Sequence, residues 1–329
     1  MNNELKKAVA VCIVAYNHEN YIKQAIESAL FQDTDFPVCL FIADDNSSDK
    51  TPDICRHYEQ NYPDRIRFIS QTQNVGTVRN TFTVFRTILN EADKYKYIAM
   101  LDGDDYWCDK DKLQKQVAFF DANPEYGLLH TQAASLNNKT GLTHYSPRKN
   151  IRTGYIFPAS LEEPMANCTV MIRIELLKHL DMDAIEKQNL FSCDYITNVI
   201  ISKVSSVGFI DEVTAVWRRE IDSVSSSKKV EKALAYIDHE IRSGKYLSSL
   251  FPVEYPFTEE EQKRYIARRK MEIALSFENY ALAKEAFHTA PIFNDRLIVK
   301  LYLKNSFFFF VFLKSKQLKK SITQYINRI

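Results

Sequence analysis

The sequence predicts an α/β fold in which a mostly parallel sheet is flanked by helices and followed by an all-helical C-terminal extension. Two observations predict this architecture. Through residues 8–121, short apolar runs alternate with helical patterns of apolar residues, and this order favours parallel strands joined by right-handed crossover helices. From residue 228 onward the strand patterns stop and only helical spacing remains.

Four apolar runs in the first half have the length and composition of buried strands, and they span residues 8–16, 38–43, 66–70 and 97–101. A helical pattern follows each run, and the predicted helices span residues 19–31, 51–62, 78–91 and 112–121. In the first helix, apolar residues recur at helical spacing at Ile22, Ala25, Ile26 and Ala29. In the second helix, Pro52 occupies the first turn, where a missing amide hydrogen costs nothing.

The pattern of elements changes after residue 123. Strands are predicted at 127–135, 168–174, 207–210 and 212–217, a helix at 194–203, and a loop region at 137–166. Further helices are predicted at 228–250, 258–277, 280–289 and 294–304. We therefore expect a first domain over 1–227, with halves 1–123 and 124–227, and a helical region over 228–329.

The composition is that of an ordinary globular protein, with 45% hydrophobic and 26% charged residues and a net charge of +1. Such a charge provides no global field for binding nucleic acid. The six cysteines form no Cys-x-x-Cys pair, which favours reduced thiols. The apolar run over 8–15 ends too early for a secretory signal and no cleavage pattern follows it, so we expect a cytoplasmic protein.

An acidic run, Leu-Asp-Gly-Asp-Asp-Tyr-Trp, occupies residues 101–107 at the end of a predicted strand. Its three carboxylates repel one another unless a cation lies among them, and Mg²⁺ and Mn²⁺ prefer carboxylate oxygens. Taken alone, the run is equally consistent with solvated turn residues. Its position favours a metal site, because ligands bind beyond the carboxyl ends of strands in open α/β sheets.

The loops after the predicted strands 8–16, 38–43 and 97–101 are dense in carboxylate, hydroxyl and amide groups. Because parallel strands end at one edge of a sheet, these three loops converge there. Turns with a purely structural role would be built mainly of glycine, proline and asparagine. The sequence therefore predicts a cleft for a nucleotide and a metal ion at this edge.

Four segments, in this order and at these separations, resemble family 2 glycosyltransferases with the GT-A fold: residues 11–22, 44–51, 73–80 and 101–107. The resemblance continues more loosely to residue 227 through 168–173, 192–195 and 216–225, whereas 228–329 resemble no family that we can name. It implies a Rossmann-like domain in which 1–123 bind a nucleotide sugar and 124–227 face the acceptor. It also implies a role in the assembly of bacterial surface polysaccharides.

By this resemblance, the donor nucleotide contacts the loops after the first two strands. Tyr16 would stack on the base and Asn17 would hydrogen bond to the nucleoside, while Asp45 would accept a hydrogen bond from the base. Arg79 would contact the diphosphate or the sugar, although a surface ion pair is the alternative for this side chain. The donor-binding residues implied in this way are Ala15, Tyr16, Asn17, Asp45, Asn74, Gly76, Arg79, Asp102 and Gly103.

Asp102 and Asp104 resemble the Asp-x-Asp pair of the family, in which one acid holds Mn²⁺ or Mg²⁺ against the donor diphosphate and the other would bind this metal or hydroxyl groups of the ribose or the sugar. The implied metal ligands are Asp104, Asp102 and Asp105, and the sequence leaves open which of them bind directly. The metal would neutralise the charge that grows on the leaving diphosphate. Gly103 would let the backbone approach closely, and Trp107 would either pack in the core or line the sugar site.

The resemblance also implies a base that deprotonates the acceptor hydroxyl, and Asp194 in Cys193-Asp194-Tyr195 is the candidate. Here Cys193 replaces the first acid of the common pair. A helix cap is the alternative role for Asp194, and Asp183 and Glu186 are the fallback bases. The implied reaction is a single displacement with inversion at the anomeric carbon.

The segment 305–329 combines the apolar run Phe-Phe-Phe-Phe-Val-Phe-Leu with four lysines that follow it. The run is too short to span a bilayer. It would either insert at the interface of the inner membrane, with its lysines on anionic lipid, or pack as a core helix. The sequence does not distinguish these two possibilities.

Together these inferences predict a metal-dependent, inverting glycosyltransferase that moves a hexosyl or N-acetylhexosaminyl group from a nucleotide sugar, UDP-linked by preference. Its acceptor would be a hydroxyl group of a glycan or a lipid-linked glycan. A sugar nucleotidyltransferase would need a glycine-rich, basic loop after the first strand, which residues 16–19 lack. A non-catalytic, membrane-peripheral assembly protein with a degenerate site is the other alternative.

Overall fold

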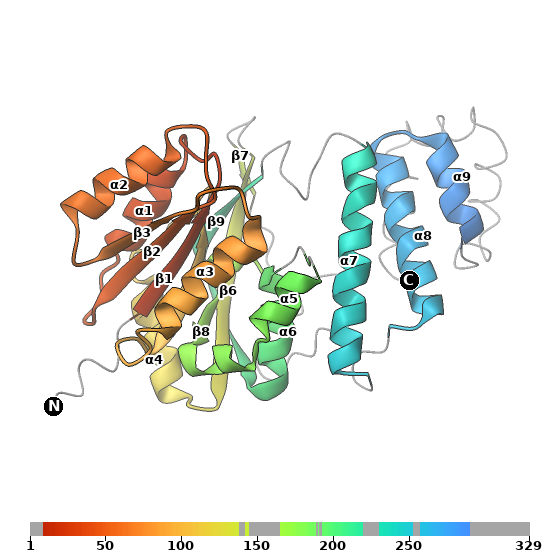
Figure 1. Cartoon of the computed structure of the whole chain (residues 1–329). Helices are drawn as coiled ribbons and strands as arrows, with labels where there is room; N and C mark the ends of the chain where they lie inside the picture. Colours follow the sequence, from red (N-terminus) through yellow and green to blue (C-terminus); the bar gives the residue numbers. More distant parts are fainter. Residues whose placement is uncertain are drawn as a thin grey trace. The chain divides into compact units, whose positions relative to one another are not determined.

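The structure is a computed structural model, and it describes residues 9–137, 142–144, 165–188, 190, 193–219, 230–252 and 257–289. The chain divides into two compact units, Met1–Glu220 and Ile221–Ile329. Figure 1 labels the helices and strands of both units.

Parallel strands form the first part of the sheet in unit one, as predicted. They are β1 (Val9–Ala15), β2 (Val38–Asp44), β3 (Ile66–Ser70) and β4 (Tyr97–Asp102). β1 lies between β2 and β4, and β3 pairs with the other side of β2. Every residue of β1 and β2 is buried. Burial on both faces explains why these strands are unbroken apolar runs in the sequence rather than alternating ones.

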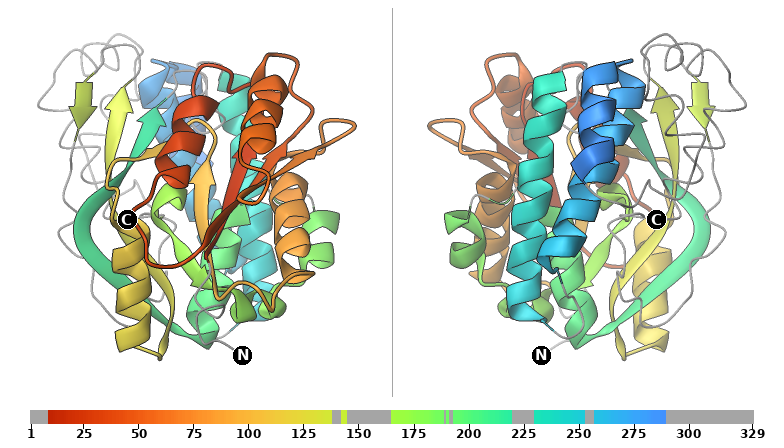
Figure 2. Two further views of the ribbon diagram at one scale, coloured as in Figure 1. Left: turned by 90° about the vertical axis from the view of Figure 1, so that its left-hand side faces the viewer. Right: turned by 90° about the vertical axis from the view of Figure 1, so that its right-hand side faces the viewer.

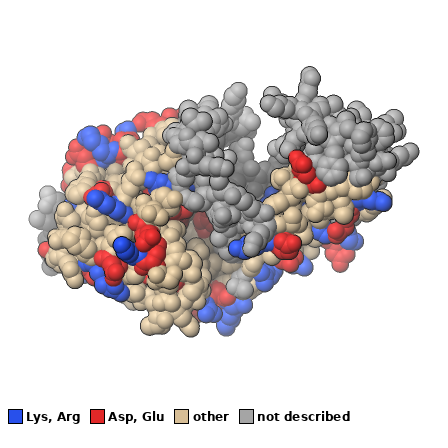
Figure 3. All heavy atoms as spheres, turned by 90° about the horizontal axis from the view of Figure 1, so that it is seen from above, with Lys and Arg blue, Asp and Glu red and all other residues tan. Residues whose placement is uncertain are grey.

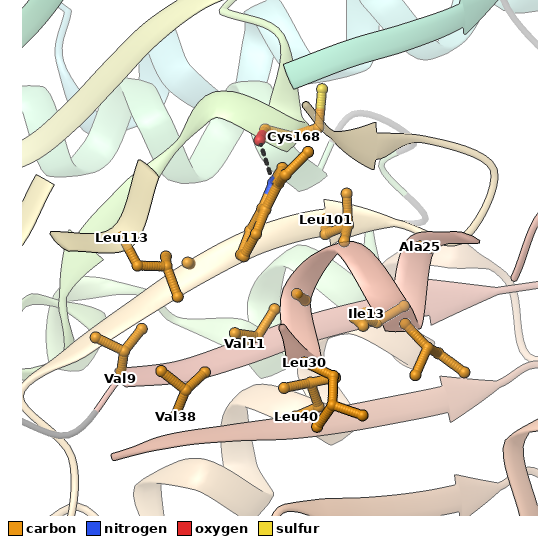
Figure 4. Packing of buried hydrophobic residues seen from close by; sticks show 14 of the residues in the cluster. Val9, Val11, Ile13, Ala25, Leu30, Val38, Leu40, Leu101, Leu113 and Cys168 are labelled. Atoms are coloured by element: carbon orange, nitrogen blue, oxygen red, sulfur yellow. Dashed lines mark hydrogen bonds between the residues drawn. The ribbon is translucent and has the colours of Figure 1, made fainter. Parts of the chain in front are cut away.

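Helices pack against the parallel strands, and the first four are α1 (Ile22–Leu30), α2 (Thr51–Asn61), α3 (Thr77–Leu89) and α4 (Lys112–Ala122). Alternate residues of β1, namely Val9, Val11 and Ile13, share a buried core with α1 and α4 (Figure 4). α3 crosses β1 and β2 in Figure 1. Since strand side chains point alternately to the two faces, a central strand needs apolar cover on both, and the sequence supplies it.

The second half of the sheet is mixed. Its strands are β5 (Tyr106–Trp107), β6 (Tyr126–Asn137), β7 (Leu142–His144), β8 (Met171–Arg173) and β9 (Ser206–Arg219). In the described part of the chain the strand order is β3-β2-β1-β4-β8-β6-β9-β5, with β7 beside β6. β8 is antiparallel to both β4 and β6, whereas β6 and β9 are parallel to each other. The parallel pairing that the alternation predicts therefore ends where β8 joins the two halves.

Two predicted strands of the second half have different bounds in the structure. β9 is one continuous strand where two were predicted, because a register shift between Thr131 and Gln132 of β6 accommodates Asp211 and Glu212 as a bulge. Of the predicted strand 168–174 only β8 pairs. The residues before it, Asn167–Thr169, form a short 3₁₀ helix instead.

The start of α1 also differs from its prediction, which placed it at residue 19. The backbone of Asn17 has a positive φ of 55°. The N–H groups of His18 and Glu19 donate to the side chains of Thr51 and Asp49, at 2.8 and 2.9 Å, rather than to a helical turn. Residues 17–21 therefore form a loop that is tied to the start of α2, and the helix begins at Ile22.

Two short helices in unit one follow the loop region. α5 (Met182–Lys187) was not predicted, because six residues are too few to show a period. α6 (Cys193–Val204) agrees with the helix predicted at 194–203 within one residue at each end. Most of the loop region 137–166 lies outside the described residues.

Unit two consists, in its described part, of α7 (Val230–Leu250), α8 (Glu259–Ser276) and α9 (Tyr280–Thr289), the cyan and blue helices of Figure 2. These three helices share one apolar core. Thr258 and Glu261 form a capping box at the start of α8. No helix among the described residues has both the length and the apolar character needed to cross a bilayer. The predicted boundary at 227, the predicted helix 294–304 and the tail 305–329 fall outside the described residues.

Candidate active site

The loops after β1 and β2 are joined by hydrogen bonds at the carboxyl edge of the sheet. The N–H group of Asn17 donates to Ser47 Oγ at 2.8 Å, and Asn17 Oδ1 accepts the N–H group of Ser48 at 2.9 Å. The N–H group of Asp45 donates to the carbonyl oxygen of Ala15 at 2.9 Å. The predicted convergence of these loops is therefore confirmed, and the Asn17 amide helps to hold them together.

Asp45 connects the end of β2 to the segment before α3. Its buried carboxylate accepts the N–H groups of Val75 and Gly76 at 2.7 and 2.9 Å, and the Asn74 amide lies 3.4 Å from its carbonyl oxygen. Gly76 has a φ of 85°, a conformation that favours glycine. Each carboxylate oxygen keeps a second lone pair, so Asp45 can still accept a hydrogen bond from a ligand.

Tyr16 and Arg79, two of the residues predicted to contact the nucleotide sugar, lie in different surroundings. The Tyr16 ring is 47% exposed beyond the end of β1, so its face is open to a base. Arg79 lies 3.7 Å from Glu186 of α5, which is the surface ion pair given above as the alternative. Glu186 and Asp183, the fallback bases, both accept hydrogen bonds from Arg86 at 2.7 Å.

Asp102 ends β4 among other acids. The side-chain amide of Asn167 donates to both of its carboxylate oxygens at 3.1 Å. Burial, followed by the negative charges of Asp104 and Asp194, raises the pKa of Asp102 to about 7. The charge of Asp194, in the first turn of α6, thus acts on the ionisation of Asp102, so the predicted base lies within electrostatic range of the predicted metal loop.

Burial also raises the pKa of Asp194, while the backbone N–H groups of Tyr195 and of Asp194 itself act in the opposite direction. Both N–H groups belong to the first turn of α6, which begins at Cys193, so Asp194 lies inside the helix rather than at its N-cap. The two contacts leave lone pairs on the carboxylate. A structural role at the start of α6 and a catalytic role are therefore compatible for Asp194.

Asp105 is more enclosed than the other two acids of the loop, with only 2% of its surface exposed. Its Oδ1 accepts the N–H group of Arg218 on β9 at 2.8 Å, and the thiol of Cys168 also bonds to it. Burial and the charge of Asp104 raise its pKa. Of the three implied metal ligands, Asp105 is thus the one already surrounded by protein atoms.

Gly103 directly follows β4 and lies against the end of β1. Its N–H group donates to the carbonyl oxygen of Val14 at 2.8 Å. A Cβ atom at this position would lie 2.8 Å from His18 Nδ1 and 3.0 Å from the Val14 carbonyl oxygen. Trp107, in contrast, is a core residue. It is buried, and its indole N–H donates to the Cys168 carbonyl oxygen at 2.8 Å, the dashed line in Figure 4.

We expect Gly103→Ala to lower the free energy of unfolding by about 1–3 kcal/mol, because the added methyl group overlaps backbone that cannot move freely. Urea unfolding of the variant and the wild type measures this difference. The same substitution should weaken nucleotide binding, because it separates the loops that follow β1 and β4. An unchanged urea midpoint would contradict the close approach.

The raised pKa of Asp102 predicts a pH dependence of stability in metal-free buffer. The unfolded chain ionises this carboxyl group near pH 4, whereas the folded protein does so at about 7. The folded protein therefore holds an extra proton between these values, and the free energy of unfolding falls as the pH rises through this window.

Replacement of this carboxyl group by an amide, in Asp102→Asn, should reduce that slope by at most about 1.4 kcal/mol per pH unit. Urea unfolding in EDTA between pH 5 and pH 8 tests this expectation on both proteins. Parallel curves for the two proteins would show that Asp102 ionises normally in the folded state.

Two residues at the site were not among the sequence-based candidates, Asn167 and Arg218. Asn167 precedes a segment that was predicted as a strand, and its side chain reaches Asp102 across 65 residues of sequence. Arg218 directly follows the predicted strand 212–217, where a charged residue is typical of a solvated position. The sequence signal for both residues was weak: Asn167 precedes the segment 168–173, and Arg218 lies within 216–225, two segments of the looser resemblance.

A metal ion at this site would take some of its ligands from the protein and the others from the phosphates of the nucleotide sugar. The charges of Asp104 and Asp194 raise the pKa of Asp102, and a divalent cation would relieve that repulsion. Among the described residues no group of three or more His, Cys, Asp or Glu side chains could hold a metal by itself. Mg²⁺ commonly binds through one or two carboxylates and substrate phosphates, which matches this donor set.

Comparison with known proteins places these features in a family context. Residues 10–185 match the family "Glycosyl transferase family 2". The chain is 40% identical over 117 residues to an uncharacterized protein of Mycobacterium tuberculosis, a match covering 36% of this chain and 32% of that protein. It is 34% identical over 115 residues to the minor teichoic acid biosynthesis protein GgaA of Bacillus subtilis, covering 34% and 24%. The match spans about a third or less of the length of these relatives.

Solved structures show the same fold over most of the chain. S. aureus TarS 1-349 in complex with UDP-GlcNAc superposes with a TM-score of 0.54 at 15% identity, covering 96% of this chain and 92% of that chain. The mannosyltransferase PcManGT of Pyrobaculum calidifontis, in complex with GDP-Man and Mn²⁺, superposes with a TM-score of 0.53 at 14% identity, covering 93% and 85%. The expected GT-A fold is thereby confirmed.

Proposed function

The chain belongs to glycosyl transferase family 2, and we propose that it transfers a sugar from a UDP-sugar or related nucleotide sugar to a hydroxyl group of a glycan or lipid-linked glycan. One observation carries the proposal. Asp194 of α6, on the acceptor side, lies close enough to raise the pKa of Asp102 at the end of β4. This electrostatic effect supports a site in which a candidate base and a candidate metal loop act on the same substrate.

The donor nucleotide would bind over the loops after β1 and β2. The exposed Tyr16 ring offers stacking area for the base, and Asp45 keeps lone pairs with which it can accept a hydrogen bond from it. Ala15, Asn17, Asn74 and Gly76 would shape this pocket through the contacts that join its loops. Arg79 would leave its 3.7 Å contact with Glu186 to meet the diphosphate.

We propose that Asp102 and Asp104 hold Mn²⁺ or Mg²⁺ together with the donor diphosphate. When bound, the metal would supply positive charge where negative charge develops on the leaving diphosphate. The enclosure of Asp105 favours a positioning role for this residue over direct ligation. Among the solved structures named above, PcManGT is complexed with Mn²⁺, which supports the choice of metal.

Asp194 would accept the proton of the acceptor hydroxyl as its oxygen attacks the anomeric carbon. The new carbon–oxygen bond forms while the bond to the diphosphate oxygen breaks, so the configuration at that carbon inverts and UDP leaves. The raised pKa of Asp194 brings its basicity nearer to neutral pH, where a general base acts most efficiently.

For the acceptor, we propose a glycan of the bacterial surface, in line with the relative GgaA, which is named for teichoic acid biosynthesis. The reaction would take place in the cytoplasm, and the segment 305–329 would dock on the inner membrane, where lipid-linked acceptors lie. Charged side chains of both signs are interspersed on the face of the molecule in Figure 3, and the net charge is +1. Neither feature favours nucleic acid as a partner.

Release of UDP from a panel of UDP-sugars, with and without Mn²⁺ or Mg²⁺, tests the proposal. We expect turnover of one donor that requires the metal and stops in EDTA. GDP- and dTDP-sugars form the second panel. Absence of turnover with all donors, together with no nucleotide binding by calorimetry, would contradict it.

A thermal-shift screen with UDP and Mn²⁺ separates the proposal from the non-catalytic alternative. A degenerate site should show no stabilisation that depends on the metal. A sugar nucleotidyltransferase would instead consume a nucleoside triphosphate and release pyrophosphate, which a pyrophosphate assay detects.

A further inference from the structure

Arg218, near the end of β9, is a buried arginine at the carboxyl edge of the sheet. Only 6% of its surface is exposed. Its guanidinium group donates to the carbonyl oxygen of Asp104 and to the side-chain oxygen of Gln24 on α1. Its own backbone N–H group donates to Asp105 Oδ1 at 2.8 Å. One residue therefore holds the acidic loop after β4 at two points.

The charge of Arg218 is balanced in an unusual way. Its guanidinium carbon lies 5.0 Å from the centre of the Tyr21 ring and 4.7 Å from that of the Tyr106 ring. None of the ion pairs formed by the described residues includes it. Burial of a cation without a carboxylate partner is costly, and two aromatic faces offset part of that cost. Arg218 is therefore better explained by the positions that its hydrogen bonds fix than by a contribution to the stability of the fold.

Three segments that belong to different parts of the proposed site meet at this guanidinium group. α1 follows the loop proposed to bind the nucleoside, Asp104 lies in the loop proposed to bind the metal, and β9 belongs to the half that faces the acceptor. The contact between Arg218 and Asp104 spans 114 residues of sequence. The guanidinium group is thus the point at which the metal loop is fixed relative to both neighbours.

We propose that Arg218 is the positioning residue of the acidic loop: it fixes the backbone of Asp104 so that the carboxylates of Asp102 and Asp104 bind the donor–metal complex together. This inference rests on the proposed function. It predicts that Arg218 acts on the metal-dependent part of nucleotide binding and leaves the nucleoside contacts intact.

A lysine cannot replace Arg218 in this role. The flat guanidinium group lies over two rings while it donates to two acceptors, whereas an ammonium group is a single point of charge. The two groups carry the same charge. The variants Arg218→Lys and Arg218→Gln therefore separate geometry from charge.

The test is the affinity of the protein for UDP, measured by calorimetry in EDTA and again in Mn²⁺. GDP or dTDP serves as the probe if it binds the wild type more tightly. For the wild type we expect binding in Mn²⁺ to be about tenfold tighter or more. For Arg218→Gln and Arg218→Lys we expect this gain to fall to about twofold, with affinity in EDTA unchanged within about twofold. Excess Mn²⁺ should partly restore donor turnover.

Arg173 on β8 offers a matched control. It stacks on Tyr97 and Phe120, at 5.5 and 4.8 Å, and donates to the carbonyl oxygens of Tyr126 and Phe120 at 2.7 and 2.8 Å. It lies beside Tyr97, at the start of β4 rather than its end. Arg173→Gln removes the same kind of contacts away from the site. It should lower the melting temperature and leave the Mn²⁺ gain unchanged.

Gln24→Ala provides a second variant in case Arg218→Gln does not fold. Gln24 is exposed on α1, so its truncation leaves the core intact while it removes one acceptor of the guanidinium group. We expect the Mn²⁺ gain to fall by about threefold.

The outcomes separate the two proposals. A full Mn²⁺ gain in the Arg218 variants, or in Gln24→Ala where those do not fold, overturns the inference while the proposed function stands. A full gain in Arg218→Lys alone shows that charge suffices, and it also overturns the inference. Wild-type protein that binds no nucleoside diphosphate contradicts the proposed function itself.

Discussion

Asp194→Asn is expected to lower kcat for sugar transfer by about 10²–10⁴-fold, the usual contribution of a positioned general base. The amide keeps the size of the side chain and the oxygen that accepts backbone N–H groups at the start of α6. It removes only the ability to take a proton. Affinity for the nucleotide in EDTA should stay within about twofold of the wild type, because the donor contacts are unchanged.

The choice of asparagine separates the two roles of Asp194. If this residue only accepts N–H groups at the start of α6, asparagine does so equally well and the variant keeps full activity, which would remove Asp194 from the mechanism. Asp181 provides the control, because its carboxylate caps α5 by accepting the N–H group of Ala184 at 2.9 Å. Asp181→Asn should leave kcat unchanged.

The pH dependence of kcat gives an independent check. Burial raises the pKa of Asp194, so activity should fall on acidification at a higher pH than an ordinary aspartate would give. The loss of kcat at low pH reports protonation of the general base in the enzyme–substrate complex. This loss should disappear from the residual activity of Asp194→Asn.

Asp104→Ala is expected to abolish metal-dependent turnover of the donor, with a loss of about 10²-fold or more, because a metal supplies several kcal/mol of charge stabilisation at a leaving diphosphate. Nucleotide affinity in EDTA should change little, whereas the gain on adding Mn²⁺ should be lost. Turnover at increasing Mn²⁺ concentration and calorimetry with UDP measure the two effects.

Asp111 offers a nearby control for Asp104. It precedes α4, its side chain makes no cap, and its 3.3 Å contact with Lys110 is exposed. Asp111→Ala should keep both turnover and metal response. If Asp104→Ala also keeps them, Asp102 alone would hold the metal, and the assignment of Asp104 would fail.

The sequence predicted the parallel half of the fold well because its signals are local. β1 and β2 are buried on both faces, so each is an unbroken apolar run, and the helices between them show their period within three turns. The elements that it missed are too short to carry a period. β5 has two residues and α5 has six, and both are held in place by their partners.

The residues of the proposed site also divide into those with a local sequence signal and those that depend on distant segments. Parallel strands place their carboxyl ends together, so the positions of Asp45 and Asp102 at one edge followed from the order of elements alone. The sequence also placed the acids of the loop after β4 and the start of α6. It contained no signal for which side chains those acids would meet, since each partner comes from a distant segment.

Local chemistry along the chain therefore determined the alternation of strands and helices, the edge at which the proposed site lies and the residue types gathered there. Only the tertiary structure decided which partners those residues contact. It enclosed Asp105 against Arg218, placed Asn167 on Asp102 and set Arg79 beside Glu186. The physical reason is that burial and charge pairing depend on which segments pack together. The contact of Asn167 with Asp102 spans 65 residues of sequence, and that of Arg218 with Asp105 spans 113.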